Sequence, residues 1–138
     1  MEKKQISKKE MTNIARDLVK KMSTIKIFTL SGPLGAGKTT LVQEMFKKLG
    51  VEEPVQSPTY TYMSVYRLPG NKTLYHFDLY RLKTEDDFIA TGLNEYLYQP
   101  HSWCFIEWPE VIENLLKNDV CRILLDYADN NARTCTIE

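Results

Sequence analysis

Four residues, Gly32, Gly37, Lys38 and Thr39, have the types and spacing of a phosphate-binding loop, G-x-x-x-x-G-K-[ST]. Glycine lets successive backbone N–H groups turn toward phosphate oxygens, and a following helix directs its positive N-terminus at the same anion. In this pattern the lysine reaches the β- and γ-phosphates and the threonine hydroxyl binds Mg²⁺. The loop therefore predicts binding of a nucleoside triphosphate together with magnesium.

Such a site requires a carboxylate to hold Mg²⁺ and a group to position the attacking water, and two carboxylates are candidates. Glu107 ends the apolar run "WCFIE", and Asp78 lies in "YHFDLY" among large apolar residues. Glu107 ends a core-like strand where ligands of α/β folds bind, which favours a functional role. For Asp78 the spacing leaves a functional role and a plain strand end equally open. It does not decide which carboxylate binds the metal.

Ser57, Pro58 and Thr59 lie downstream of the helix predicted after the loop, where switch segments contact the γ-phosphate in many nucleotide-binding proteins. An ordinary turn set by Pro58 is the alternative. Composition favours packing roles for Trp108, at a strand end, and for His76, within a strand. With two histidines and no ligand spacing, a histidine metal site is not expected.

These side chains need a framework of alternating strands and helices to bring them together. A capping box at Ser7 and Glu10, followed by apolar residues at helical spacing, predicts a helix over 7–22. The further predicted elements are a strand at 25–30, a helix at 38–49, a hairpin of strands 57–68 and 73–82 around a turn at 69–71, a helix at 84–98, a strand at 102–107, a helix beginning at Pro109, and two closing strands, "CRILLDYA" and "ARTCTIE". The alternation predicts an α/β fold with parallel central strands. The tyrosines at 60, 62 and 66 are expected to pack on the hairpin.

Length and charge narrow the class of protein. The 138 residues, 43% hydrophobic and 26% charged, predict a single globular domain over 1–138. Lys plus Arg equals Asp plus Glu at 18 each, so the net charge is zero. A protein that binds nucleic acid by electrostatics alone is normally basic. Any RNA role is therefore expected to be indirect or confined to a local patch.

The three cysteines, Cys104, Cys121 and Cys135, are odd in number and widely spaced, which argues against a disulfide framework or a zinc site. We expect them to be reduced, as in the cytoplasm. The N-terminus lacks the apolar segment of a secretory signal, and no run approaches the roughly 20 apolar residues of a membrane span. The expected location is cytoplasmic, without membrane association.

Four segments in order, "GPLGAGKTTL", "VQSPTYTYM", "YHFDLYRL" and "FIEWPE", resemble the TsaE family of ATPases of bacterial tRNA threonylcarbamoyladenosine biosynthesis. The resemblance implies a P-loop NTPase fold with a mixed, mainly parallel sheet flanked by helices. It implies that Thr39 and Glu107 hold Mg²⁺, that Asp78 lies near the γ-phosphate to position water, and that Trp108 lies close to the nucleotide. It further implies a switch at Ser57 to Thr59 and a phosphate-binding segment made of Gly35, Ala36, Gly37, Lys38, Thr39 and Thr40.

The same resemblance implies a weak ATPase that uses ATP and Mg²⁺ and associates with the TsaB and TsaD proteins. TsaD would carry out the transfer to tRNA, so contact with tRNA is indirect. Hydrolysis would reset the TsaB–TsaD complex between turnovers.

Three other classes of protein share part of this pattern. A small GTPase would need N-K-x-D, but "NKTL" at 71–74 has leucine in the place of the aspartate. A nucleotide or metabolite kinase would need a basic lid, and no arginine-rich lid follows Glu107. A non-catalytic, ATP-gated binding module shares every motif except a working water-positioning residue. Slow phosphate release, tested with Asp78→Ala, separates that module from an ATPase.

Overall fold

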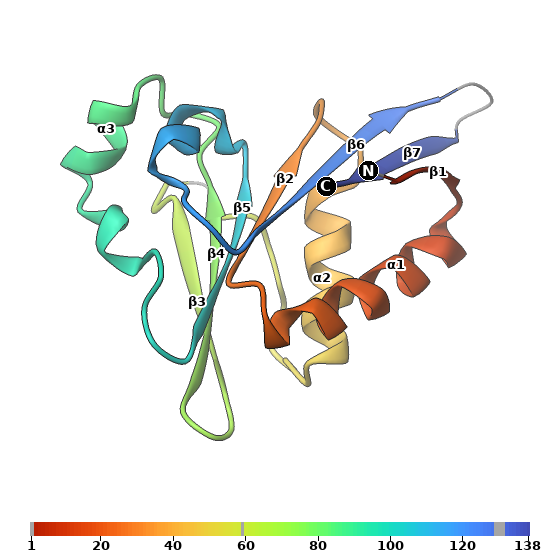
Figure 1. Cartoon of the computed structure of the whole chain (residues 1–138), viewed down its shortest axis with the longest axis horizontal. Helices are drawn as coiled ribbons and strands as arrows, with labels where there is room; N and C mark the ends of the chain where they lie inside the picture. Colours follow the sequence, from red (N-terminus) through yellow and green to blue (C-terminus); the bar gives the residue numbers. More distant parts are fainter. Residues whose placement is uncertain (1, 59, 129–131) are drawn as a thin grey trace.

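The computed structural model describes residues 2–58, 60–128 and 132–138. Within these ranges seven strands form one mixed sheet in the order β1-β7-β6-β2-β5-β4-β3 (Figure 1). The strands are β1 (Glu2–Ile6), β2 (Ile27–Ser31), β3 (Met63–Leu68), β4 (Lys72–Asp78), β5 (Ser102–Glu107), β6 (Val120–Tyr127) and β7 (Arg133–Ile137). β6, β2, β5 and β4 run parallel, and antiparallel strands extend the sheet at both edges. The predicted α/β class and mainly parallel centre are confirmed.

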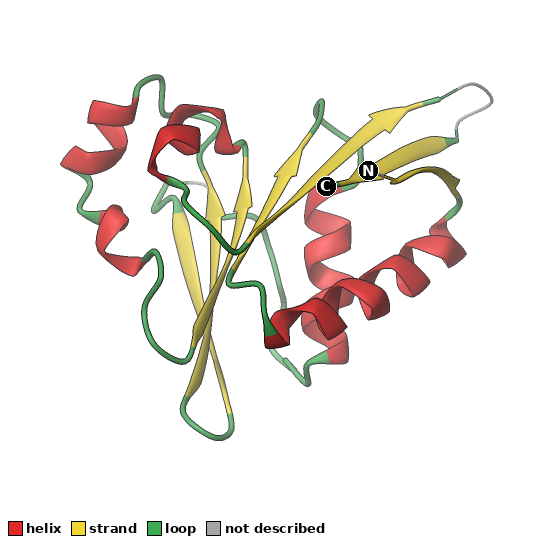
Figure 2. Ribbon diagram, in the orientation of Figure 1, coloured by secondary structure: helices red, strands yellow, loops and turns green. Residues whose placement is uncertain are grey.

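Helices cover both faces of this sheet. α1 (Lys8–Lys20) and α2 (Lys38–Lys48) lie on one face, and α3 (Glu85–Ala90) lies on the other (Figure 1). Among the described residues there are also short 3₁₀ helices, namely η1 (Lys21–Ser23), η2 (Leu93–Tyr96) and η3 (Pro109–Leu115) (Figure 2). In the described part of the chain, no helix has the length and apolar character needed to traverse a bilayer.

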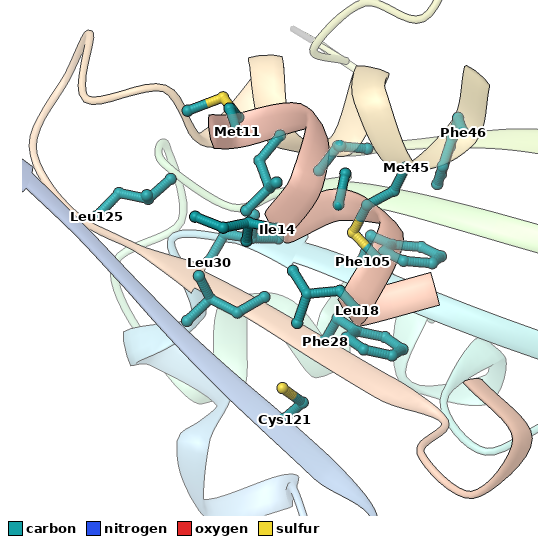
Figure 3. Close-up of a cluster of buried hydrophobic side chains, with 14 of the residues drawn as sticks. Met11, Ile14, Leu18, Phe28, Leu30, Met45, Phe46, Phe105, Cys121 and Leu125 are labelled. Carbon is teal, nitrogen blue, oxygen red and sulfur yellow. The ribbon is translucent and has the colours of Figure 1, made fainter. Parts of the chain in front are cut away.

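The alternation of side chains along the central strands divides the core into two layers. On β2, Phe28 and Leu30 face α1 and α2, whereas Ile27 belongs to the cluster on the α3 face. Figure 3 shows the first layer, in which Phe28 stacks on Phe105 of β5 with ring centroids 5.2 Å apart. Burying one such side chain contributes about 1.5–3 kcal/mol. Parallel strands covered on both faces therefore provide a rigid frame at their carboxyl ends.

Several local predictions are confirmed. The Ser7 hydroxyl accepts a hydrogen bond from the Glu10 N–H at the start of α1, as the capping box requires. Thr84 caps α3 in the same way by accepting from the Asp87 N–H. The hairpin turn contains Gly70 at φ 82°, a conformation that glycine adopts without a steric penalty.

Other predicted boundaries are wrong. The strand expected over 57–68 begins only at Met63, because Tyr62 has a φ of 63° and interrupts extended backbone. Its partner, expected to reach residue 82, ends at Asp78. The helix expected over 84–98 breaks at Gly92, with a φ of 80°, and continues as the 3₁₀ helix η2. The helix predicted to begin at Pro109 does begin there, as the 3₁₀ helix η3.

β1 was not predicted from the sequence. Its sequence, EKKQI, lacks the apolar alternation that predicts a strand. β1 pairs antiparallel with β7 at the edge of the sheet, where charged residues are normal. The partner strand, rather than local propensity, therefore decides this element.

Candidate functional site

The loop between β2 and α2 has the backbone conformation that its glycines permit. Gly32, Gly35 and Gly37 have φ values of 140°, 76° and 108°. A Cβ built on Gly32 would lie 2.0 Å from the Leu125 carbonyl oxygen of β6, so only glycine fits there. α2 begins directly after Gly37, and its N-terminus points into the loop. The geometry is that of an anion-binding loop at a helix N-terminus.

A cavity of about 320 Å³ lies over this loop. Its walls come from distant parts of the chain: the loop and the first turn of α2, the segment before β3, the ends of β4 and β5, and the start of β7. The lining residues are Leu34, Gly35, Gly37, Lys38, Thr39, Thr40, Ser57, Asp78, Glu107, Trp108 and Arg133.

Lys38 is almost fully buried, with 5% of its surface exposed. Its ammonium donates hydrogen bonds to the carbonyl oxygens of Gly32 and of Pro33, the latter at 3.2 Å. Burial lowers the pKa of Lys38 from its ordinary value, while the nearby carboxylates of Glu107, Glu110 and Asp78 act in the opposite direction. The side chain therefore lies in the cavity as a desolvated cation close to acidic groups.

Glu107, the last residue of β5, is 3% exposed. The Thr39 hydroxyl donates to its carboxylate, with Oγ1 2.9 Å from each oxygen. His76 Nε2 lies 2.6 Å from Glu107 Oε2. The carboxylate is thus held between the first turn of α2 and the middle of β4.

Asp78 ends β4 and pairs in register with Glu107 on β5. The Ser57 hydroxyl donates to Asp78 Oδ2, and the Tyr80 N–H donates to Oδ1 at 3.1 Å. The two carboxylates therefore lie at adjacent strand ends, and Asp78 joins the segment before β3 to the cavity.

Trp108 follows Glu107 with φ 57° and ψ 57°, a conformation that few non-glycine residues adopt. This turn brings its ring over Lys38, with the ammonium 3.7 Å from the ring centroid. The Tyr80 ring also packs against Trp108, tilted, with the two ring centroids 4.9 Å apart. Composition alone favoured packing of Trp108 on the core, and its half-buried side chain does pack against the core cluster on the α3 face while also lining the cavity.

The structure brings together nearly all the residues that the sequence analysis proposed. Ala36 is different, because its side chain lies in the core and its N–H donates to the Pro33 carbonyl within the loop. Thr59 lies outside the described residues. His76 is packed as expected, with no exposed surface. Tyr60 does not pack on the hairpin: it is 78% exposed, and Arg81 lies over its ring at 4.8 Å.

Two features of the site were not predicted from the sequence. Arg133 begins β7, and its Nη1 would lie 3.5 Å from a Cβ built on Gly37. No local pattern connects an arginine near the C-terminus with the loop, and only the sheet order brings them together. The second feature is the contact of His76 with Glu107. It could have been predicted from the sequence, because His76 lies two residues before Asp78 and therefore on the same face of the strand.

The oxygen atoms of Thr39 and Glu107 fit a hard cation such as Mg²⁺, which prefers oxygen ligands. Within the described residues, no group of three or more His, Cys, Asp or Glu side chains could hold a metal ion. Mg²⁺ is usually bound by one or two protein oxygens together with substrate phosphates and water, so a sparse protein ligand set agrees with this ion.

Comparisons with known proteins agree with this geometry. Residues 5–135 match the family model for TsaE, described as threonylcarbamoyl adenosine biosynthesis protein TsaE. A protein of Rickettsia typhi, named tRNA threonylcarbamoyladenosine biosynthesis protein TsaE, is 35% identical over 96% of this chain and 90% of its own length. The Haemophilus influenzae protein of that name is 41% identical over 73% of this chain and 63% of its own length.

A solved structure supports the same relationship. The crystal structure of Bacillus subtilis YdiB superposes with a TM-score of 0.75 at 30% sequence identity, covering 99% of this chain and 83% of that one. The similarity therefore extends through the whole sheet, including β7, whose Arg133 lines the cavity.

Proposed function

The chain belongs to the TsaE family of threonylcarbamoyl adenosine biosynthesis proteins, and from that premise we propose that it binds and slowly hydrolyses ATP. The observation that carries this proposal is the convergence of Lys38, Thr39, Asp78 and Glu107 on one cavity. A phosphate-binding loop alone would support nucleotide binding. Two carboxylates at adjacent strand ends above it supply the acidic groups that hydrolysis requires.

Different residues of the chain bind different parts of the nucleotide and its metal ion. Backbone N–H groups of the loop and of the first turn of α2 bind the phosphate oxygens. Lys38 leaves the loop carbonyls and donates to the β- and γ-phosphates, and Arg133 adds a second positive charge beside Gly37. Thr39 and Glu107 would hold Mg²⁺, which would neutralise part of the charge on the phosphates.

Asp78 is proposed to orient the attacking water. Hydrogen bonds from Ser57 and from the Tyr80 N–H fix its carboxylate, and each oxygen retains capacity to accept from water. Because Ser57 belongs to the segment before β3, a change at the γ-phosphate would reach that segment through Asp78. This connection through Asp78 is the basis for proposing that the segment containing Ser57 is a switch.

The proposed partners are TsaB and TsaD, with tRNA contacted indirectly through TsaD, in the cytoplasm. Hydrolysis would reset the TsaB–TsaD complex between turnovers. The protein is expected to hydrolyse ATP weakly by itself, because P-loop NTPases commonly need a partner to complete stabilisation of the transition state.

The test measures phosphate release and ATP binding on the same samples, with and without TsaB and TsaD. The wild type should bind ATP, release phosphate slowly and associate with the two partners only when nucleotide is present. Asp78→Asn should bind ATP but lose about 100-fold or more in hydrolysis, within the range for a group that acts on the reacting water. Asp86→Asn on the exposed part of α3 is the control. Binding without hydrolysis in the wild type would instead identify a non-catalytic, ATP-gated module.

A further inference from the structure

His76 and Glu107 form a buried polar pair beneath the cavity. Their side chains are 0% and 3% exposed, and His76 Nε2 lies 2.6 Å from Glu107 Oε2. The other side of His76 faces the core: the ring of Phe46 on α2 lies 6.2 Å away in an edge-on arrangement. Leu74, two residues earlier on the same strand face, is fully buried. His76 is therefore fully buried, and its Nε2 atom is the one that hydrogen-bonds to a residue of the cavity.

The chemistry of the two groups gives this contact a direction. A carboxylate oxygen only accepts, so the Nε2 proton of His76 is donated to Glu107. Nδ1 is buried and has no partner among the described residues. The ring therefore makes one strong hydrogen bond rather than bridging two groups, and that bond goes to Glu107.

This contact matters because the Glu107 carboxylate also accepts a hydrogen bond from Thr39. Its two oxygens lie equally close to the Thr39 hydroxyl, at 2.9 Å each, so Thr39 alone does not select a rotation of the carboxylate. The His76 bond holds Oε2 on the side of β4. Oε1 then has the Thr39 hydroxyl as its one hydrogen-bond partner among the described residues.

We propose that His76 is a positioning residue, which holds the Glu107 carboxylate in the orientation that accepts Mg²⁺ with the nucleotide. This inference rests on the proposed function, since it concerns how the same site binds Mg²⁺ and ATP. Groups that hydrogen-bond to metal ligands typically contribute about 10- to 100-fold to metal affinity or activity. His76 also lies two residues before Asp78, so one strand carries both the orienting group for Glu107 and the second carboxylate.

The test is a calorimetric titration of the full chain with a non-hydrolysable ATP analogue, once with Mg²⁺ and once with EDTA. The measured quantity is the ratio of the two affinities. His76→Gln keeps an N–H donor near the position of Nε2, and His76→Asn places its amide near Nδ1, out of reach of Glu107. His76→Leu removes the donor. Leu74→Ala, on the same strand face, is the control for loss of packing without loss of the hydrogen bond.

We expect His76→Leu and His76→Asn to lose about 10-fold or more of the Mg²⁺-dependent gain in affinity, and His76→Gln to recover most of it. Leu74→Ala should lower the melting temperature and leave the ratio unchanged. If His76→Leu does not fold, the comparison of Gln with Asn decides the question. Equal ratios in the wild type, Gln and Asn variants would overturn the positioning role. A wild type that binds no ATP would overturn the proposed function instead, and the inference with it.

Discussion

The ammonium of Lys38 lies 3.7 Å from the centroid of the Trp108 ring and donates to two carbonyl groups of its own loop. A cation over an aromatic face contributes about 0.5–2 kcal/mol, more where water is excluded. Under the proposed function, nucleotide phosphates would therefore have to compete with these contacts for Lys38. Since Tyr80 packs on the same indole, the position of Lys38 is coupled to an exposed residue just after β4.

Lys38→Met should weaken ATP binding about 10- to 100-fold, because hydrogen bonds to charged groups contribute about 1.5–3 kcal/mol. The melting temperature should not fall, because the variant removes a charge that is costly to bury. Calorimetry and thermal unfolding measure the two effects. Lys48→Met, exposed on the same helix, is the matched control and should change neither. Full ATP affinity in Lys38→Met would contradict the assignment of the site.

Gly32→Ala should lower the free energy of unfolding by about 2–4 kcal/mol, from overpacking and an unfavourable φ. The new Cβ would lie 2.0 Å from the Leu125 carbonyl oxygen, and a backbone atom cannot give way as a flexible side chain does. Gly50→Ala also has a positive φ, 93°, but its Cβ would meet nothing within 4 Å. It should cost about 1–2 kcal/mol. Urea unfolding of both variants measures the difference, and equal losses would show that the contact with β6 is unimportant.

Arg133→Gln should weaken binding of both ADP and ATP about 5- to 10-fold, while the isolated fold remains stable. The guanidinium lies on the cavity wall beside Gly37, where it adds positive charge to the phosphate-binding loop. Arg122→Gln on β6 provides the control, because Arg122 pairs with Glu113 and does not line the cavity. Binding should also become less sensitive to salt in Arg133→Gln alone. Identical affinities for the two variants would exclude a role for Arg133.

Stability should fall as the pH rises above about 9, in part through Cys104. Burial raises the pKa of this thiol from 9.0 to about 12. Between these values the unfolded chain loses the thiol proton and the folded chain keeps it, so fewer protons are bound in the unfolded state and unfolding becomes easier as pH rises. The contribution is fully present below pH 9. Urea unfolding of the wild type and of Cys104→Ala between pH 8 and 10.5 should therefore give a steeper decline for the wild type. If the free energy of unfolding fell equally steeply with pH in both proteins, Cys104 would not contribute to the pH dependence.

Because Cys104 is almost fully buried, the rate at which its thiol is alkylated also reports on its protection in the folded state. Alkylation of Cys104 at pH 8 should proceed only when the sheet opens, because the thiolate is the reactive form and the native thiol is both buried and neutral. Mass spectrometry of the modified peptide follows the rate. Adding ATP and Mg²⁺ should slow it further, since a ligand that binds only the folded state stabilises that state.

The local signals in the sequence were reliable where one short stretch contains its own physical cause. The glycine loop, the Ser7 and Thr84 caps and the buried run ending at Glu107 each follow from spacing within a few residues. Elements whose form depends on a distant partner were predicted less well. β1 exists because β7 pairs with it, and β3 begins late because the backbone turns at Tyr62. Ser57, in the segment before that turn, contacts Asp78.

By itself, the sequence determined that a phosphate-binding loop joins a strand to a helix and that two carboxylates end apolar runs farther along. The types of side chain and their spacing are sufficient for that, because the backbone of a loop and the faces of a strand obey local rules. Only the tertiary structure decided that His76 holds Glu107, that Trp108 covers Lys38 and that Arg133 reaches Gly37. These contacts depend on strand order and register, which follow from burying both faces of the whole sheet and cannot be read from any single segment.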